Sequence, residues 1–555
     1  MVDRFKLALA QLNPTVGAVE ANLAAARAAR AGAARDGAEL MLFSELYISG
    51  YPPEDLVLKP SFVAACRRAV EAFAADTHDG GPALLVGTPW AEAGAVYNAV
   101  ALLDGGRVET VRFKHVLPNY GVFDEARVFA SGPAPGPVNF RGVRLGVPIC
   151  EDIWREEVPE CLVETGAEIL LVPNGSPYER DKPDERLNIA VARVTETGLP
   201  LAYLNQIGGQ DELVFDGASF ALNADRSLAV QLPGFQTAVV TVEWHRTGAG
   251  WRVSGPIAPS ADGADGVWRA CVLGLKDYVD KNRFPGVVLG LSGGIDSAVV
   301  AAMAVDALGR ERVHCVMLPY RYTASESLED AKACAAVLGC RYDVVPIEAA
   351  VAGFSAALDP LFAGLEPDVT EENIQSRCRG TALMAISNKF GPMVLTTGNK
   401  SEMSVGYATL YGDMNGGFNP IKDVYKSQVY ALARFRNQQR PHGCLGPPAR
   451  VIPERILTKA PSAELREDQT DQDTLPPYEA LDAILADLVE GELSVAEVAA
   501  KGFDRSIVER VQQMLYTAEY KRRQAAPGVK ITRRNFGRDR RYPITNGFRD
   551  RGRGP

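Results

Sequence analysis

The run Leu289-Gly-Leu-Ser-Gly-Gly-Ile-Asp-Ser-Ala298 decides the fold of the second half of this chain. The apolar residues 286–291 have the length and β-branching of a buried parallel strand, and the small apolar residues 298–308 are typical of a buried helix. Glycines between them allow backbone N–H groups to turn toward an anion, and the helix start adds its positive dipole end. The sequence therefore predicts a phosphate-binding loop between a strand and a helix.

The spacing of this loop differs from the two common Gly-rich nucleotide motifs. It matches neither Gly-x-x-x-x-Gly-Lys-Ser/Thr nor Gly-x-Gly-x-x-Gly, which disfavours a Walker-type ATPase and a Rossmann dehydrogenase. The run Ser-Gly-Gly-Ile-Asp-Ser at 292–297 instead resembles the fingerprint of the N-type ATP pyrophosphatases. That resemblance implies an enzyme that activates a carboxylate or carbonyl group by adenylylation.

Length and composition limit the class of protein. A chain of 555 residues with 46% hydrophobic and 23% charged residues is long enough for two or more folded domains. The formal charge of −10 argues against a general nucleic-acid binder. We expect neither a secretory signal nor a membrane span, because charges interrupt the N-terminal residues and Asp306 interrupts the apolar helix. Nine cysteines without Cys-x-x-Cys spacing indicate reduced thiols and a cytoplasmic protein.

The pattern of apolar runs predicts two α/β domains joined by a linker. Residues 1–250 alternate short strands with helices or loops, which indicates a layered α/β domain. Its expected strands are 6–12, 40–43, 83–87, 143–149, 169–172 and 201–204. Residues 251–268 are rich in Pro, Gly and Ser and form the predicted linker. In residues 269–555, strands at 286–291, 313–318 and 393–397 alternate with helices such as 325–338 and 376–389, as in a doubly wound parallel sheet.

Three residues of the first domain could form a thiol-based catalytic site. Each alone has an ordinary explanation: Glu45 as a helix N-terminal acid, Lys114 as a surface cation and Cys150 as a buried thiol. Together they supply a base, a cation and a nucleophile. A thiol with a pKa of about 8.5 needs a base or a nearby positive charge to become thiolate. Attack on an amide creates an oxyanion, which a lysine ammonium can stabilise.

These segments resemble the nitrilase, or carbon–nitrogen hydrolase, superfamily over most of residues 4–245. The catalytic triad of that superfamily is Glu-Lys-Cys, in the same order as Glu45, Lys114 and Cys150 in this chain. The resemblance implies an αββα layered domain. A Cys–His pair with His115 is the competing interpretation, but an extended segment would point His115 away from Lys114. The surrounding runs resemble the glutaminase branch of the superfamily. This implies that the following residues bind glutamine: Tyr120, Ser176 and Lys182.

The second domain resembles ammonia-using and glutamine-dependent NAD synthetases over about residues 260–546. The segments that carry the likeness are 373–379, 396–402, 411–417, 422–426, 458–465, 468–473 and the basic run 521–541. The resemblance implies a sheet of the adenine nucleotide alpha hydrolase type. It also implies that ATP binds at Gly290, Leu291, Ser292, Gly293, Gly294, Ile295, Asp296, Ser297 and Thr397. Deamido-NAD would bind at Asn373, Glu402 and Lys521, with Arg377, Lys400 and Lys459 as further candidates.

Two of these residues are candidate ligands for Mg²⁺. Asp296 and Glu402 offer hard carboxylate oxygens beside the expected triphosphate. Asp296 has an alternative explanation as an acid that stabilises a helix N-terminus. The sequence leaves both readings of Asp296 open.

The combined resemblance implies a glutamine-dependent NAD synthetase. One domain would hydrolyse L-glutamine to glutamate and ammonia. The other would use ATP, Mg²⁺ and this ammonia to convert deamido-NAD⁺ into NAD⁺ through an adenylylated intermediate, with release of AMP and diphosphate. This is the final step of NAD biosynthesis, and it would require no nucleic acid or membrane. The resemblance also implies a homo-oligomer. Two sites in one chain predict that ammonia travels inside the protein, because free ammonia would become unreactive ammonium at neutral pH.

Two other functions fit parts of the pattern. The first is another amidotransferase of the same two-part design that acts on a different carboxylate. The second is a nucleotide-sensing regulatory protein with a retired catalytic half, which the intact set of Glu45, Lys114 and Cys150 disfavours.

Overall fold

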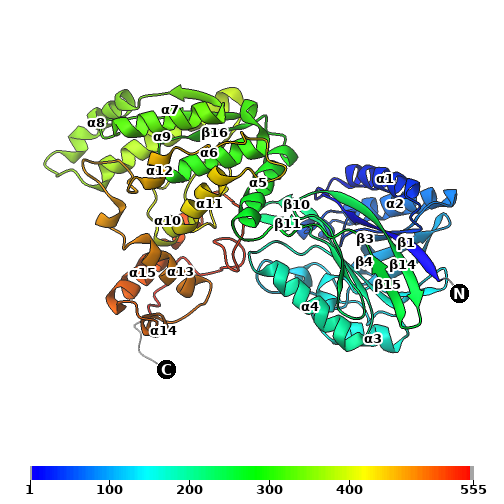
Figure 1. Cartoon of the computed structure of the whole chain (residues 1–555). Coiled ribbons are helices and arrows are strands. Elements are labelled where there is room, and N and C mark those ends of the chain that lie inside the picture. The colour runs from blue at the N-terminus through cyan, green and yellow to red at the C-terminus, as the bar shows by residue number, and fades with distance from the viewer. Residues whose placement is uncertain (1–2, 551–555) are drawn as a thin grey trace. The chain divides into compact units, whose positions relative to one another are not determined.

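The computed structural model describes residues 3–550 of the chain (Figure 1). The chain divides into two compact units, Met1–Ala261 and Asp262–Pro555, which are called the N-terminal and C-terminal units below. Residues 1–2 and 551–555, at the outer ends of the two predicted domains, lie outside the described residues. Each unit is described by itself.

The N-terminal unit contains two large mixed sheets. The first has the strand order β15-β14-β1-β2-β3-β4-β5, in which β1, β2 and β3 are parallel and the other pairs are antiparallel. Its strands are β1 (Arg4–Gln11), β2 (Leu40–Leu42), β3 (Ala83–Glu92), β4 (Ala95–Asp104), β5 (Arg107–Phe113), β14 (Ala238–Thr247) and β15 (Gly250–Ser254). The second has the order β13-β12-β9-β8-β7-β6. Its strands are β6 (Val138–Phe140), β7 (Val143–Gly146), β8 (Ile169–Asn174), β9 (Leu201–Asn205), β12 (Phe220–Leu222) and β13 (Leu228–Gln231), and a separate hairpin joins β10 (Ile207–Gln210) to β11 (Leu213–Asp216).

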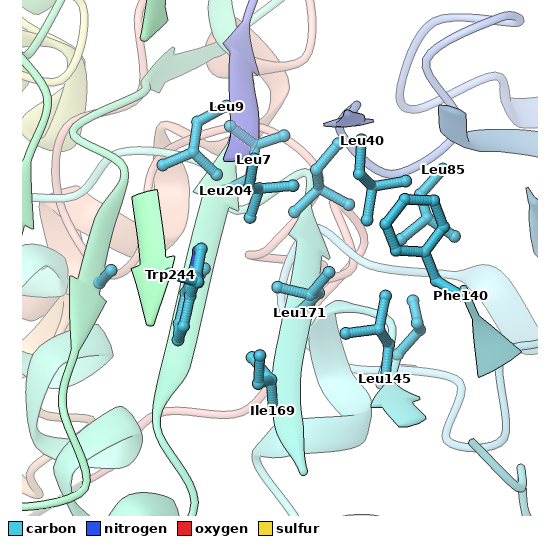
Figure 2. Packing of buried hydrophobic residues seen from close by; sticks show 14 of the residues in the cluster. Leu7, Leu9, Leu40, Leu85, Phe140, Leu145, Ile169, Leu171, Leu204 and Trp244 are labelled. Carbon is cyan, nitrogen blue, oxygen red and sulfur yellow. The ribbon is translucent and has the colours of Figure 1, made fainter. Parts of the chain in front are cut away.

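The two sheets pack face to face through apolar side chains. Leu7 and Leu40 of the first sheet belong to one buried cluster with Leu145 and Leu171 of the second, as Figure 2 shows. All four side chains are inaccessible to solvent. Because successive strand residues point to opposite faces, the neighbours of these leucines are turned toward the outside of the sandwich.

Helices cover both outer faces of this sandwich (Figure 1). On the first sheet, α1 (Val19–Arg35) and α2 (Pro60–Asp76) pack against residues such as Ala8 and Met41. On the second, α3 (Glu157–Glu164) and α4 (Lys182–Thr197) pack against residues such as Leu170. The order of layers is therefore helix, sheet, sheet, helix, which confirms the predicted αββα architecture.

Two details of the N-terminal unit differ from the expected strands. The strand expected at 143–149 ends at Gly146, because Pro148 has no N–H group to donate to a neighbouring strand. The antiparallel strands β4 and β5, which extend the first sheet beyond β3, were not among the expected strands. Charged residues interrupt the apolar pattern in β5, whereas β4 is mostly apolar and its pattern does not explain the omission.

The C-terminal unit is built on a parallel sheet with the order β18-β17-β16-β19. Its strands are β16 (Val287–Gly290), β17 (Val313–Met317), β18 (Arg341–Val344) and β19 (Met393–Leu395). After β16 the chain adds two strands on one side and then returns to add β19 on the other. The order thus reverses beside β16, and open α/β sheets place ligands at such a reversal, outside the carboxyl ends of the strands.

Helices cover both faces of this sheet, which confirms the predicted doubly wound domain. On one face, α8 (Glu348–Phe362) and α9 (Val369–Phe390) share an apolar cluster with Val288 and Val316. On the other face lies α6 (Ile295–Leu308), in which every residue except Asp296 is buried. The other helices are α5 (Gly263–Lys281), α7 (Ser325–Leu338), α10 (Lys400–Val405), α11 (Lys426–Gln438), α12 (Glu454–Thr458), α13 (Tyr478–Val489), α14 (Val495–Ala500), α15 (Arg505–Thr517) and α16 (Glu519–Arg522).

Candidate active sites

Glu45 and Lys114 form a buried ion pair in the N-terminal unit. The Nζ atom of Lys114 lies 2.7 Å from Oε1 of Glu45, and neither side chain is accessible to solvent. Oε2 of Glu45 accepts the backbone N–H of Gly175 at 2.9 Å. A Cβ atom on Gly175 would lie 2.6 Å from the ring of Tyr51, so only glycine fits this close approach. The base is therefore held in place from two sides.

A second carboxylate, Glu125, completes the surroundings of Lys114. Its two oxygens lie 2.9 and 3.0 Å from Nζ of Lys114, and it accepts the hydroxyl of Tyr51 at 2.8 Å. Burial raises the pKa of Glu125 to about 7; Lys114 opposes this rise and Glu45 adds to it. Burial alone would lower the pKa of Lys114, but Glu125 and Glu45 raise it well above its ordinary value. Lys114 is therefore an ammonium ion.

Cys150 begins the short 3-10 helix Cys150–Ile153 with a left-handed backbone, φ +47°. A non-glycine residue rarely adopts this conformation, and such strain is frequent at functional sites. Burial and the charge of Glu45 raise the pKa of Cys150 well above its usual value, whereas Lys114 lowers it. The resting thiol is thus protonated and depends on a base for its reaction. These electrostatic interactions place Cys150 with Glu45 and Lys114, as the predicted triad requires.

Asp152 links the two segments that carry Lys114 and Cys150. Its Oδ1 atom accepts the backbone N–H groups of His115 at 3.1 Å and Val116 at 2.8 Å. Its Oδ2 atom accepts the N–H of Ile149, immediately before Cys150, at 2.9 Å. The carboxylate therefore joins the residue after the lysine to the residue before the cysteine. The ring of His115 is bonded elsewhere, with Nδ1 2.7 Å from the carbonyl oxygen of Gly132.

Two of the three predicted glutamine-binding residues surround Glu151, the neighbour of Cys150. The hydroxyl of Tyr120 donates to the Glu151 carboxylate at 3.0 Å. The ammonium of Lys182 interacts electrostatically with the same carboxylate and lies 4.3 Å from the ring centre of Trp154. The third residue, Ser176, follows Gly175 and is buried, and its Oγ accepts Nε of Arg186 at 3.0 Å.

In the C-terminal unit, the glycine loop turns tightly between β16 and α6. Gly293 has φ +83°, and a Cβ atom there would lie 2.4 Å from the carbonyl oxygen of Ser327. Both facts require glycine. The hydroxyls of Ser292 and Ser297 lie 3.1 Å apart, and the N–H of Ser292 donates to Oγ of Ser297. These contacts hold the loop in its tight turn.

This loop lines a cavity of about 290 Å³. All nine predicted ATP-binding residues lie in its wall, namely Gly290, Leu291, Ser292, Gly293, Gly294, Ile295, Asp296, Ser297 and Thr397. The loop follows β16 and Thr397 follows β19, so the cavity opens at the carboxyl ends of two strands where the strand order reverses. Its position and its glycine loop make it suitable for a nucleotide phosphate chain.

Asp296 and Glu402, both in the cavity wall, converge on the ammonium of Lys426. Nζ of Lys426 lies 2.5 Å from Oδ2 of Asp296 and 3.0 Å from Oε1 of Glu402. Burial raises the pKa of Glu402 to about 7, with Lys426 opposing and Asp296 adding to the rise. Burial would lower the pKa of Lys426, but the two carboxylates raise it above its ordinary value. The two acids therefore face one cationic point.

The other predicted deamido-NAD residues, Asn373 and Lys521, are described but lie outside the wall of this cavity. Oδ1 of Asn373 accepts the hydroxyl of Thr409 at 2.9 Å. Nζ of Lys521 donates to the carbonyl oxygens of Gly406 and Ala408 at 2.8 and 2.7 Å. Both side chains thus contact the segment that follows α10 and that also contributes Ala408 to the wall.

The three further candidates have separate surroundings. Lys459 lies in the cavity wall, 2.6 Å from both Ser327 and Glu464. Lys400 is fully buried 2.8 Å from Asp423, and Nε of Arg377 donates to a backbone carbonyl. Lys459 alone of these three faces the cavity in the described chain.

Sequence reasoning missed Glu125, Asp152 and Lys426 as site residues. Each lies in a run that had been singled out for chemistry: 113–125 around Lys114, 150–154 after the cysteine and 422–426 before α11. The presence of further charged residues in those runs was the available signal. The spacing of the charged residues in these runs did not indicate which side chains would point into a site.

Comparison with known families matches both units. A carbon–nitrogen hydrolase family model matches residues 6–251, and an NAD synthase model matches residues 267–525. A carbon–nitrogen hydrolase domain with a buried thiol and an NAD synthase domain with a phosphate loop occur in the same chain. This combination defines an ATP-dependent amidoligase that carries its own glutaminase domain.

Full-length relatives identify the family within this class. A glutamine-dependent NAD(+) synthetase of Rhodobacter capsulatus is 54% identical over 99% of this chain and 100% of its own length. One from Xanthomonas campestris is 49% identical over 98% of both chains. The solved structure of such an enzyme from Acinetobacter baumannii, in complex with ADP, has a TM-score of 0.78 at 42% identity and 99% coverage of both chains. The chain belongs to the glutamine-dependent NAD(+) synthetases, which confirms the resemblance found in the sequence.

Proposed function

We propose that Cys150 attacks the side-chain amide of glutamine while Glu45 accepts the thiol proton and passes it to the departing ammonia. The observation that carries this assignment is the buried contact of 2.7 Å between Glu45 and Lys114 beside a strained, buried cysteine. The Lys114 ammonium stabilises the oxyanion of each tetrahedral intermediate. Water, deprotonated by Glu45, then releases glutamate from the thioester.

The residues around Glu151 are suited to the polar end of glutamine. The polar groups there are the carboxylate of Glu151, the phenol of Tyr120 and the ammonium group of Lys182. Glu151 directly follows the nucleophile Cys150. An α-amino group would pair with Glu151, and an α-carboxylate would pair with Lys182. Ser176 directly follows Gly175, whose N–H group donates to the catalytic candidate Glu45. Tyr120, Ser176 and Lys182 therefore remain our candidates for glutamine binding.

In the C-terminal unit we assign the diphosphate of ATP to the loop Gly290–Ser297. The glycine loop and the start of α6 both line this part of the cavity, and a helix N-terminus favours an anion. The carboxylate of deamido-NAD⁺ attacks the α-phosphate, which forms an acyl adenylate and releases diphosphate. Ammonia then displaces AMP. A carboxylate is a poor acyl donor, whereas this mixed anhydride has a good leaving group.

Asp296 and Glu402 are suited to hold Mg²⁺ with the phosphates of ATP. They already converge on one positive charge, the ammonium of Lys426. No group of three or more His, Cys, Asp or Glu side chains among residues 3–550 is arranged for a metal ion, so phosphate and water would complete the coordination. A bound Mg²⁺ would neutralise phosphate charge at the site. Lys426 would then be displaced toward the phosphates or the acyl adenylate.

We assign deamido-NAD⁺ to the region that joins Glu402, Asn373 and Lys521. Glu402 faces the cavity, and the other two residues brace the segment 406–409 that leads to its wall. Burial lowers the pKa of Lys521, with Asp413 opposing this effect. An approaching phosphate would favour its charged form.

We also propose that the enzyme is a cytoplasmic homo-oligomer. All nine cysteines are free thiols, as expected in a reducing compartment. Among the described residues, no helix is both long and apolar enough to cross a membrane. Of the fully described α8, only Val351 is buried, whereas Phe354 and Leu361 are exposed by 56% and 75%. An apolar surface of this kind is typical of a contact with a second copy, and light scattering after gel filtration measures the assembly.

The proposed reaction is tested by its stoichiometry. Purified enzyme is incubated with deamido-NAD⁺, Mg-ATP and glutamine. Equal amounts of NAD⁺, AMP, diphosphate and glutamate support the proposal. Formation of ADP and phosphate, or the absence of NAD⁺, would exclude adenylylation of deamido-NAD⁺.

Replacement of Asp152 should reduce glutamine hydrolysis selectively. In Asp152→Asn, one side-chain oxygen becomes an NH₂ group, so at least one of the three N–H donors loses its acceptor. An ångström-scale displacement of catalytic groups costs up to about 10²-fold, and we expect a tenfold to hundredfold loss of kcat for hydrolysis. NAD⁺ formation from ammonium should not change. An equal loss of both activities would show general misfolding instead.

Glu125 should create a pH dependence of glutamine hydrolysis near pH 7. Tyr51, Lys114 and Asn98 all donate hydrogen bonds to the Glu125 side chain, and these bonds are strongest when the carboxylate is ionised. Because the pKa of Glu125 is about 7, acidification through this value protonates it, weakens its hold on Lys114 and lowers kcat. In Glu125→Gln, we expect a roughly tenfold lower rate that no longer falls on acidification through pH 7. If the rate of the variant still fell at the same pH as the rate of the parent, a group other than Glu125 would cause the pH dependence.

A further inference from the structure

Two cysteines of the C-terminal unit lie in contact, outside the sites described above. Sγ of Cys315, in β17, is 3.6 Å from Sγ of Cys340, which follows α7. Cys315 is fully buried, whereas Cys340 is partly exposed. Gly339, with φ +71°, ends α7 and turns the chain so that Cys340 faces β17. The pair thus combines an accessible sulfur with a protected one.

The contact also shifts the pKa values of the two thiols in opposite directions. The hydrogen bond between the two sulfurs lowers the pKa of Cys340, although partial burial opposes this effect. The same contact and burial raise the pKa of Cys315 well above its usual value. Cys340 is therefore the more readily ionised and the more accessible of the two thiols, and oxidants attack accessible thiols that ionise readily. The protonated neighbour is in position to resolve the oxidised form.

Both cysteines belong to elements that shape the nucleotide cavity. Cys315 pairs in the sheet with Leu289, one residue before the glycine loop, and the residues after it, Val316 to Leu318, line the cavity. At the other end of α7, the carbonyl of Ser327 lies so close to Gly293 that no side chain fits between them. A shift of β17 relative to α7 is therefore transmitted to the loop from two directions.

We propose that Cys315 and Cys340 are a peroxide-sensitive dithiol whose oxidation to a disulfide slows ATP-dependent amidation. Hydrogen peroxide converts the Cys340 thiol to a sulfenic acid and water. The Cys315 sulfur then attacks Sγ of Cys340, and a second water leaves with the proton of Cys315. In total, two thiols lose two electrons and two protons to one peroxide. A dithiol reductant reverses the reaction.

The bond would disturb the site because the sulfurs must approach from 3.6 Å to about 2 Å. The displacement falls between β17 and α7, the two elements that hold the glycine loop. This inference depends on the proposed ATP site. Displacements of about 1 Å can cost up to roughly 10²-fold in rate, so we expect at least a roughly tenfold loss on oxidation.

The test uses the full chain with Cys150→Ala, so that the reactive thiol of the other unit does not contribute. Ammonium-dependent NAD⁺ formation is measured before peroxide, after peroxide and after reduction with dithiothreitol. Free thiols are alkylated, and tryptic peptides are mapped by mass spectrometry. We expect a cross-link between the peptides 313–321 and 333–341, a loss of activity and its recovery on reduction.

Two further variants complete the test. With Cys340→Ala added, the cross-link and the loss of activity should disappear. Cys334→Ala is the matched control, because Cys334 lies in the same tryptic peptide but contacts the carbonyl of Val451. This control should behave like the parent. A cross-link without loss of activity, a loss that persists in Cys340→Ala, or no cross-link would overturn the inference, whereas inactivity before oxidation would count against the proposed function.

Discussion

Cys150→Ala is expected to abolish glutamine-supported NAD⁺ formation while ammonium still supports it. Alanine removes the only atom that can form the thioester, and loss of a catalytic nucleophile lowers rates by about 10³-fold or more. The cavity proposed to bind ATP lies in the other compact unit, and Glu45, Lys114 and Cys150 do not line it. The measurement is the rate of NAD⁺ formation with each nitrogen donor at saturating ATP and deamido-NAD⁺.

Cys161→Ala is the matched control for this variant. Cys161 is a partly exposed thiol of α3 in the same unit, and it should retain both activities. If Cys150→Ala still used glutamine, another nucleophile would have to act. If it lost ammonium-dependent activity as well, the proposed division of labour would be wrong.

Asp296→Asn should produce the opposite pattern. The substitution removes one of the two carboxylates that face Lys426 and the proposed Mg²⁺ site. Loss of such charge stabilisation typically costs about 10² to 10³-fold. NAD⁺ formation should therefore fall by this amount with either glutamine or ammonium. Hydrolysis of glutamine to glutamate, measured directly, should continue.

Glu311→Gln provides the control, because this exposed acid lies beyond the opposite end of α6. It should not change either activity. If Asp296→Asn retained full synthetase activity, Asp296 would be only a helix-stabilising acid, the alternative that the sequence left open. If Mg²⁺ at high concentration restored the activity, that result would support its role as a ligand.

Much of the fold was predictable because local patterns and tertiary packing agree. The helix expected at 325–338 is α7, Ser325–Leu338, whose apolar residues repeat with helical spacing and which ends at Gly339. The loop at 290–297 was equally clear from its glycines, of which Gly293 is required for both conformation and space. Glu45, which lies just beyond the end of β2, was recognisable only together with Lys114 and Cys150.

Contacts between distant segments were not predictable in this way. Lys114 meets Glu45 across 69 positions and Glu125 across 11, yet only the resemblance to a family connected the first pair. Lys426 reaches Asp296 across 130 positions. Periodicity determines which face of an element is apolar, but it does not determine which charged side chains from separate loops share a partner.

The basic C-terminal run shows the same limit. The sequence predicts that this region faces substrate phosphates, but several of its cations have partners within the protein. Lys530 lies 3.1 Å from Asp539, and Arg540 lies 2.7 Å from Glu519. Lys521 contacts backbone carbonyls and has no ion pair within 4 Å among the described residues.

The most direct test follows the amide nitrogen of glutamine. The enzyme is supplied with deamido-NAD⁺, Mg-ATP and glutamine labelled with ¹⁵N in the side-chain amide, together with unlabelled ammonium in the buffer. Mass spectrometry of the nicotinamide product then measures the origin of its nitrogen. Transfer within one protein predicts NAD⁺ that carries mainly ¹⁵N. Label diluted to the level of the ammonium pool would contradict coupled transfer, and no NAD⁺ at all would contradict the assigned reaction.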